Sequence, residues 1–294
     1  MTKMRATLIG FAAVILWALL ALLTVGSAPT PPLLLNTICF TIGGTCGVIW
    51  THQSGGFAML RSVPLRVYIF GTLGLFGYHA LYFSALRLAP AAEAGLIAYL
   101  WPLLIVILSG LLPGEKVRRG HLIGAIVGFA GAALIISGGG SGFRMDYLPG
   151  YGLALICALT WSSYSVLSRL VGDAPTQSVT VFCIGAAALS LPLHLMFEDT
   201  VLPQSAMGWG SILLLGLGPV GLAFFVWDIG VKQGDIQLLG AASYAAPLLS
   251  TVVLVMAGVA PLSATLGIAA ILVTGGAMIA ARASLRKNPS STGA

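Results

Sequence analysis

Charged side chains are scarce in this 294-residue chain, because Asp, Glu, Lys and Arg together make up only 7% of it. A soluble domain has about a quarter of its residues charged. With 58% hydrophobic residues and a mean hydropathy of +1.00, the chain cannot cover itself with a polar surface. We therefore interpret it as an integral membrane protein that is surrounded by the lipid bilayer. The sequence indicates no obligate protein partner.

Several motifs are also missing, and each absence excludes a class of function. The four cysteines lie in apolar stretches without a CxxC pair or a Cys/His cluster, so neither a disulfide framework nor a metal site is expected. No phosphate-binding GxxxxGKS or GxxxxGKT loop occurs, which argues against direct use of ATP, and no cofactor is expected. The net charge of +6 comes from basic residues at helix ends and not from a patch, so nucleic-acid binding is not expected.

Long apolar runs fill most of the chain. About 20 apolar residues are needed to cross a bilayer as a helix, and turn-forming Pro, Gly and Ser residues separate such runs. The first run is longer than the core of a signal peptide, so it is interpreted as a membrane helix. This spacing predicts ten transmembrane helices in an all-α protein: 7–25, 32–51, 66–87, 91–112, 121–139, 150–171, 178–197, 208–231, 237–259 and 262–283.

The basic residues predict the orientation of these spans. If the N-terminus is cytoplasmic, twelve of the 14 Lys and Arg residues fall on the cytoplasmic side, and only Arg87 and Arg144 on the other. Cytoplasmic loops of membrane proteins carry an excess of Lys and Arg. The distribution therefore predicts that both termini are cytoplasmic and that the number of spans is even.

The two halves of the chain resemble each other at an offset of about 145 residues. Tyr99-Leu-Trp-Pro102 corresponds to Tyr244-Ala-Ala-Pro247, and the same offset pairs Tyr82 with Trp227 and Arg87 with Lys232. A duplicated unit with five spans must insert in two opposite orientations. This pattern predicts two inverted five-helix repeats, 1–140 and 141–294, and is typical of alternating-access carriers with a site between the repeats.

A family resemblance rests on several motifs in combination. The run Ala91-Ala-Glu-Ala-Gly-Leu-Ile-Ala-Tyr-Leu-Trp-Pro102, followed by Leu112-Pro-Gly-Glu-Lys116 and Gly120-His-Leu-Ile-Gly124, resembles the EamA-type repeat of the drug/metabolite transporter superfamily. A second copy runs from Ala241-Ala-Ser-Tyr-Ala-Ala-Pro247 to Gly275-Gly276. The second copy departs from the first at Ala260, which stands at the position of Glu115. Glu115 is therefore expected to be a structural feature of a cytoplasmic loop.

Within that superfamily, the aromatic content of the middle helices resembles that of bacterial aromatic amino-acid exporters of the YddG type. The resemblance implies a ten-helix carrier of the bacterial inner membrane, with a central cavity and export as its direction. Without the resemblance, the residues predict only a carrier with a site near the middle of the membrane.

Polar and aromatic residues deep in the spans are the candidates for a substrate site. His79 lies far inside the third span, on the same helix face as Tyr82, with Tyr78 at the margin of that face. A polar group at this depth usually faces a cavity or a polar partner, and a hydrogen bond between helices is the structural alternative. Tyr99 and Trp101 precede Pro102, and Tyr244 precedes Pro247, so both pairs are expected at helix kinks. The predicted substrate-binding set is Trp17, Tyr78, His79, Tyr82, Tyr99, Trp101, Trp161, Tyr164, Trp227 and Tyr244.

Three charged residues are candidates for gating or coupling. Asp228 lies inside a span and is expected to form an ion pair with Lys232, one helical turn later, although it could instead bind a substrate ammonium or carry a proton. Arg87 and Lys232 are repeat mates on opposite sides of the membrane, where each could stabilise a gate. Extension of either side chain to the lipid headgroups is an equally good interpretation.

The predicted function is therefore secondary transport of a small-molecule substrate, with aromatic amino acids such as Phe, Tyr and Trp as the expected cargo. The alternatives are export of lipophilic drugs or of other metabolites by the same fold. An intramembrane enzyme is a remote alternative, because no nucleophile–base set or carboxylate pair lies at depth. A channel would need a continuous polar lining, and these spans are too apolar for one.

Overall fold

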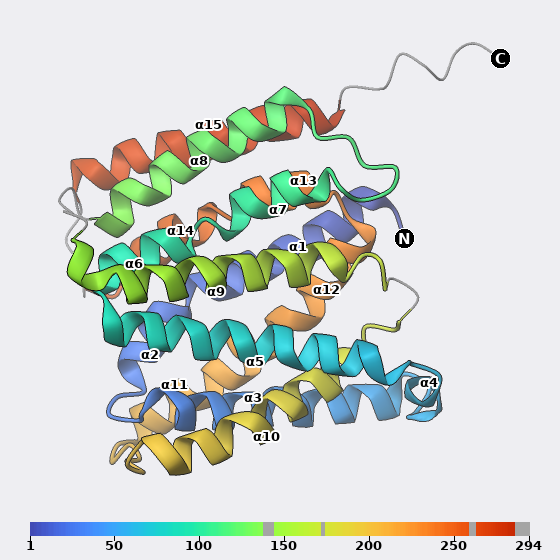
Figure 1. The fold of residues 1–294 in the computed structure, drawn as a ribbon, viewed down its shortest axis with the longest axis vertical. Helices are drawn as coiled ribbons and strands as arrows, with labels where there is room; N and C mark the ends of the chain where they lie inside the picture. Colours follow the sequence, from blue (N-terminus) through green and yellow to red (C-terminus); the bar gives the residue numbers. More distant parts are fainter. Residues whose placement is uncertain (138–143, 172–173, 259–262, 286–294) are drawn as a thin grey trace.

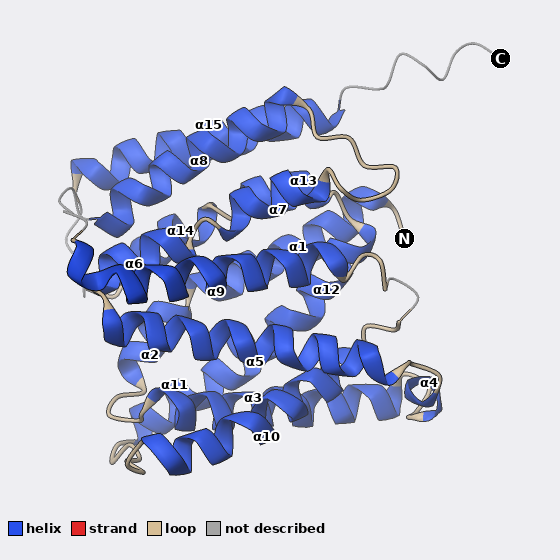
Figure 2. Cartoon of the chain, in the orientation of Figure 1, coloured by secondary structure: helices blue, strands red, loops and turns tan. Residues whose placement is uncertain are grey.

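The computed structural model describes residues 1–137, 144–171, 174–258 and 263–285. These residues form helices and connecting loops, without a strand among them (Figure 2). In a bilayer the backbone N–H and C=O groups find no water, so apolar segments satisfy them within helices. The predicted all-α membrane architecture is confirmed.

The first half contains the helices of five spans. The first span combines α1 (Lys3–Ala18) and α2 (Leu20–Gly26), and the fourth combines α6 (Ala91–Ala98) and α7 (Trp101–Ser109). The others are single helices: α3 (Pro32–Gln53), α5 (Leu65–Leu88) and α8 (Arg119–Ser137), with the short α4 (Ala58–Arg61) in the loop between α3 and α5.

The second half repeats this plan with one additional irregularity. Its single helices are α9 (Leu148–Leu167), which follows the 3-10 turn η1 (Met145–Tyr147), α10 (Ser178–Phe197) and α15 (Ala264–Leu285). The eighth span consists of α11 (Ala206–Leu217), the π-helical turn η2 (Gly218–Leu222) and α12 (Ala223–Gln233). The ninth is divided into α13 (Ile236–Ala242) and α14 (Ala245–Met256).

These elements agree with the ten spans expected from the sequence. Among the described residues, eight helical segments are long and apolar enough to cross a membrane, and Glu93–Ser109 is a shorter apolar helix. The remaining span is α5, whose 24 residues are also long enough to cross a bilayer.

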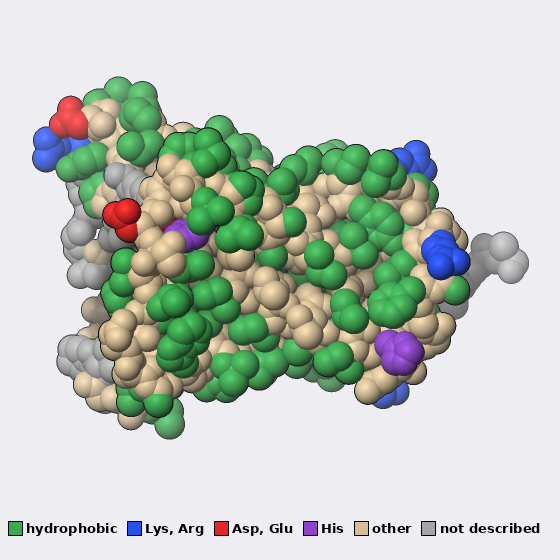
Figure 3. All heavy atoms as spheres, turned by 90° about the horizontal axis from the view of Figure 1, so that it is seen from below, with side chains coloured by type: hydrophobic (Ala, Val, Ile, Leu, Met, Phe, Trp, Pro, Cys, Tyr) green, Lys and Arg blue, Asp and Glu red, His purple; other side chains and the backbone are tan. Residues whose placement is uncertain are grey.

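The helices run side by side, and α1 begins at the same end of the bundle at which α15 ends (Figure 1). We call this the terminal end and the other the far end. On the face shown in Figure 3, the coloured charged side chains gather at the two ends, and hydrophobic side chains cover the middle. This distribution fits a bundle whose middle is in contact with lipid.

The most extensive contacts between helices of the first half and helices of the second half have counterparts when the two halves are exchanged, as the following pairs show. The fifth and tenth spans pack together as α8 and α15, and the second and seventh as α3 and α10. The first span packs on the eighth through α1 and α12. The corresponding pair, formed by the sixth span (α9) and the third span (α5), is also in contact. The two halves therefore interlock and do not form separate bundles.

Glycines make the closest helix contacts. A Cβ atom placed on Gly124 would lie 2.5 Å from the carbonyl oxygen of Gly276, and one placed on Gly10 would lie 2.7 Å from the Cα atom of Gly230. Because lipid supplies no hydrophobic force between helices, such small residues allow the backbones to pack directly.

Candidate functional site

Four tryptophans meet in the middle of the bundle. The ring of Trp17 lies 6.0 Å from that of Trp101, 5.8 Å from that of Trp161 and 5.1 Å from that of Trp227, measured between centroids. Trp161 and Trp227 are stacked at 6.1 Å, and Trp101 meets Trp227 edge to face at 5.7 Å. We call these four residues the tryptophan cluster. Trp17 and Trp101 belong to the first half of the chain, and Trp161 and Trp227 to the second.

Two hydrogen bonds fix the orientation of rings in the cluster. The indole N–H of Trp17 donates to the carbonyl of Pro219 at 3.1 Å, and that of Trp227 donates to the Ser165 hydroxyl at 3.1 Å. Pro219 lies in the π-helical turn η2, where the regular hydrogen-bond ladder is interrupted. Such turns are frequent at functional sites, because they expose a carbonyl within a helix. Here the exposed carbonyl holds a ring from the other repeat.

His79 packs next to the cluster between two phenylalanines. Its ring lies 5.2 Å from Phe40 and 6.0 Å from Phe224, and Nδ1 donates to the carbonyl of Leu75 at 2.7 Å. The predicted site residues included neither phenylalanine. A signal for Phe224 was nevertheless present, because the 145-residue offset pairs it with His79. The corresponding signal for Phe40 is absent, since the offset pairs it with no aromatic residue.

The tyrosines extend the cluster toward α5 and α6. Tyr78 lies 5.3 Å from Trp161 and stacks in parallel on Tyr82 at 6.1 Å, and Tyr99 lies 6.2 Å from Trp101. We had expected Tyr78 to lie at the margin of the face shared by His79 and Tyr82. Tyr78 also stacks on Tyr82, its i, i+4 neighbour, which agrees with a place beside that face. Tyr164 is buried between Trp161, at 5.3 Å, and Phe70, at 5.4 Å.

Tyr244 lies apart from these rings. It is completely buried, packs against Phe129, and belongs to the apolar cluster between α8, α14 and α15. Its hydroxyl accepts a hydrogen bond from the backbone N–H of Leu103 at 3.0 Å. That N–H is in the first turn of α7 and has no partner within its own helix. The structure therefore places Tyr244 as a cap for a broken helix.

The helices break at matching places in the two repeats. The fourth span is interrupted at Tyr99 and Leu100, just before Pro102, and the ninth at Ser243 and Tyr244, before Pro247. Proline has no N–H to donate to the preceding turn, so a helix is weak there. Through Tyr244 and Leu103 the two breaks are hydrogen-bonded to each other. At the breaks, Ser243 and Tyr244 are fully buried and Tyr99 is half-buried.

Asp228 and Lys232 form the expected ion pair. Oδ1 of Asp228 lies 3.0 Å from Nζ of Lys232, and the two side chains are 1% and 5% exposed. Oδ2 accepts from the Thr176 hydroxyl at 2.8 Å, and Nζ also donates to the carbonyl of Ala174 at 2.9 Å. The pair is therefore buried and hydrogen-bonded on both sides. Arg87 lies near the far end of α5, and its side chain is outside the described part of the structure.

The tryptophan cluster is closed on most sides. Trp101, Trp161 and Trp227 are 4%, 3% and 1% exposed, whereas Trp17, Tyr78, His79, Tyr82 and Tyr99 are half-buried. The half-buried side chains form the less enclosed edge of the cluster. Among the described residues, no group of three or more His, Cys, Asp or Glu could hold a metal ion.

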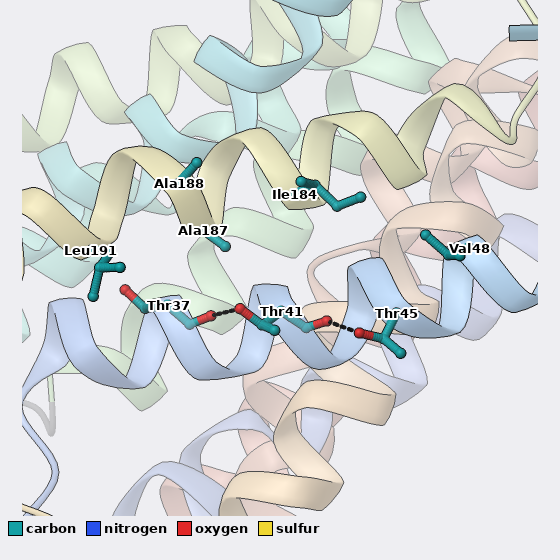
Figure 4. A pocket seen from close by; sticks show the side chains of 8 residues that line it. All are labelled: Thr37, Thr41, Thr45, Val48, Ile184, Ala187, Ala188 and Leu191. Atoms are coloured by element: carbon teal, nitrogen blue, oxygen red, sulfur yellow. Dashed lines mark hydrogen bonds between the residues drawn. The ribbon is translucent and has the colours of Figure 1, made fainter.

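A separate groove lies on the outside of the bundle between α3 and α10. It has a volume of about 290 Å³ and is lined by the residues labelled in Figure 4. The hydroxyls of Thr41 and Thr45 donate to carbonyls four residues earlier in their own helix, at 2.7 Å each. The groove thus offers few polar groups to a ligand, and the tryptophan cluster remains the better candidate site.

Comparison with known proteins agrees with this architecture. The EamA-like transporter family matches the chain twice, over residues 4–137 and 148–282. The chain is 51% identical to the aromatic amino acid exporter YddG of Ancylobacter novellus, over 95% of this chain and 98% of that one. It is 26% identical to the YddG exporter of Escherichia coli strain K12, with coverages of 95% and 97%. A crystal structure of a protein with 49% identity superposes with a TM-score of 0.92 and covers 97% of this chain and 100% of that one. With two copies of the family's repeat spanning nearly its whole length, the chain belongs to the EamA-like transporter family.

Proposed function

We propose that this protein exports aromatic amino acids across the bacterial inner membrane by alternating access, and that the tryptophan cluster holds the aromatic ring of the substrate. The observation that carries the proposal is the origin of the cluster, because each half of the chain contributes two of its four indoles. A movement of one repeat against the other changes the distances between these rings. Substrate bound among them is thereby coupled to the movement.

The cluster suits a flat, apolar group. Aromatic side chains prefer edge-to-face or offset contacts with centroids about 4.5–7 Å apart, and the four indoles already make such contacts with one another. A substrate ring can exchange one of these contacts for a similar one. The half-buried Tyr78, Tyr82 and Tyr99 would then form the remaining wall.

The polar end of an amino acid needs hydrogen-bond partners at the same depth. His79 is one candidate, because its ring is held beside the cluster by the bond to Leu75. The indole N–H groups of Trp101 and Trp161, which belong to the cluster itself, are two more. A substrate carboxylate can accept from both.

In this proposal, the distribution of Lys and Arg residues sets the orientation of the protein in the membrane. The terminal end is cytoplasmic, and residues 1–140 and 141–294 form five-helix units of opposite orientation. Pro102 and Pro247 mark the flexible points of the two units. Arg87, Asp228 and Lys232 remain candidates for gating or coupling, and the buried Asp228–Lys232 pair is the strongest of the three.

Transport by purified protein in liposomes tests the proposal. Liposomes loaded with labelled phenylalanine should release it faster than protein-free liposomes, and unlabelled tryptophan should compete. Release without competition by tryptophan, or release of lipophilic drugs only, would replace the aromatic amino-acid assignment by the drug-export alternative. An imposed pH gradient tests coupling. If the Asp228→Asn variant responds to that gradient as the parent does, Asp228 is not the coupling group.

A further inference from the structure

A network of polar residues closes the terminal end of the bundle directly beyond the tryptophan cluster. Nη1 of Arg169 lies 2.8 Å from Oε1 of Glu115, and Nη2 donates to the carbonyl of Gly234 at 2.6 Å. The second carboxylate oxygen of Glu115 accepts from the amide of Gln237 at 3.0 Å. One arginine and one carboxylate thus connect the loop after α7, the end of α9 and the segment between α12 and α13.

These contacts are well shielded from water. The side chains of Arg169 and Glu115 are 16% and 18% exposed, and Gln237 is 2% exposed. Ion pairs on an open surface contribute little, whereas charge-assisted hydrogen bonds in a shielded place are stronger. The far end carries a contrasting example, since Arg144 and Asp146 pair at 2.7 Å but are 65% and 70% exposed.

The network is connected to helices that carry the tryptophan cluster. Along α9, Trp161, Ser165 and Ser168 lie on one helix face, and Arg169 follows immediately. Along α12, Lys232 comes five residues after Trp227, and Gly234 directly follows the end of the helix. A polar pocket of about 160 Å³, lined by Lys116, Arg118 and Gln237 among others, lies at the same end. Glu115 and Gln237 of the network also line this pocket.

The network joins the two repeats but has no counterpart in the internal symmetry. Glu115 belongs to the first half and Arg169, Gly234 and Gln237 to the second. The 145-residue offset pairs Glu115 with Ala260 and Arg169 with Thr24, so neither charge is duplicated. The far end has a different buried contact between the repeats, in which the Tyr151 hydroxyl donates to Glu93. The network of Glu115 and Arg169 therefore acts on the terminal end alone.

We propose that Glu115 and Arg169 form a cytoplasmic latch whose opening is required for substrate to enter from the terminal end. This inference rests on the alternating-access part of the proposed function, and not on the identity of the substrate. The latch stabilises the state that is closed to the cytoplasm. Glu115 and Arg169 act by positioning the helices and do not contact substrate.

Accessibility of two single cysteines measures the latch without any substrate. Ser168→Cys reports access from the terminal end, because Ser168 is buried on the cluster face of α9. Tyr82→Cys reports access from the far end, because Tyr82 lies one turn nearer that end than Tyr78. A membrane-impermeant maleimide is applied to vesicles of either orientation. The same protein without the introduced cysteine gives the background labelling from the native cysteines.

Glu115→Gln and Arg169→Gln should each raise the labelling rate at residue 168 by about tenfold and lower the rate at residue 82. A tenfold change is expected when the conformation closed at the terminal end loses about 1.4 kcal/mol of stabilisation relative to the other. The double variant should resemble the single ones, because both substitutions break the same interaction. Arg144→Gln is the matched control and should change neither rate.

Several results would overturn the proposal. Unchanged labelling at residue 168 in both single variants would show that the network does not hold the end shut. A rise at both reporters would indicate general loosening, and multiplication of the two effects in the double variant would show that the residues act separately. If Arg169→Gln does not give folded protein, Glu115→Gln and Arg169→Lys test the same contact. A latch that responds as expected in a protein that moves no aromatic amino acid would refute only the substrate assignment.

Discussion

Two buried regions of this protein are built in opposite ways. Along the seam between α8 and α15, glycines bring backbones into contact, as Gly124 does with Gly276. At the tryptophan cluster, large rings from four helices fill the space between backbones that stay apart. The seam joins two repeat mates, whereas the cluster joins four spans, of which only α1 and α9 are repeat mates. Added volume should therefore damage the seam, whereas removed side chains should damage the cluster.

The two kinds of packing suit different roles, the glycine seam that of holding the bundle together and the tryptophan cluster that of binding a ligand. A seam of small residues holds two helices in one arrangement, since backbone contacts tolerate no displacement. Ring contacts with centroids 5–6 Å apart can be exchanged for other ring contacts at little cost. The rigid region thus supports the bundle, and the exchangeable region suits a ligand.

The largest expected effect is on the seam. In the Gly124→Leu variant, the new side chain would collide with the carbonyl of Gly276 and the backbone of Ala280. We expect a loss of roughly 3 kcal/mol or more in stability, with little folded protein in the membrane. Thermal unfolding in detergent measures this. Gly275→Leu is the control, because nothing lies within 4 Å of a Cβ atom there, and equal damage by both variants would contradict the distinction.

The next largest effect is on the cluster. Trp101→Ala removes a ring that contacts Trp17, Trp161 and Trp227. Stacking on an aromatic residue contributes about 1 kcal/mol or more, so phenylalanine efflux should fall about tenfold while expression in the membrane is retained. Trp209→Ala removes an exposed tryptophan near a span end and should leave efflux unchanged. Full activity of the Trp101 variant would remove this residue from the proposed site.

A smaller effect is expected at the edge of the cluster. His79→Ala should reduce efflux about fivefold, because it removes a single hydrogen-bonding group worth about 1 kcal/mol. Efflux at several phenylalanine concentrations shows whether binding or turnover changes. His52→Ala, in the last turn of α3, is the control and should transport normally. If the two variants behave alike, His79 has only a packing role.

The smallest effect should come from Tyr244→Phe. The ring remains packed against Phe129, and only the hydrogen bond from the N–H of Leu103 is lost. We expect a decrease of about 1 kcal/mol in stability and efflux close to that of the parent. A selective loss of efflux without a change in melting temperature would instead place Tyr244 in the substrate path.

Much of the site follows from the sequence, but its boundaries do not. The depth of His79 and the repeat pairing of Tyr82 with Trp227 identified residues that lie in or beside the tryptophan cluster. The same logic placed Tyr244 with them, since it matches Tyr99. The structure instead turns Tyr244 toward α8, where it caps the break in the fourth span. A repeat fixes the position of a residue along a helix but not the neighbours that surround it.

The sequence by itself determined the membrane class, the ten spans, the family repeat and the Asp228–Lys232 pair. These depend on hydrophobicity, on turn residues and on neighbours within one helical turn, all of which are local. Only the tertiary structure decided which rings meet, that Phe40 and Phe224 enclose His79, and that Glu115 reaches Arg169. Those contacts depend on how each helix is rotated and how the two repeats interlock. Rotation is set by close packing between helices, and no single helix carries that information.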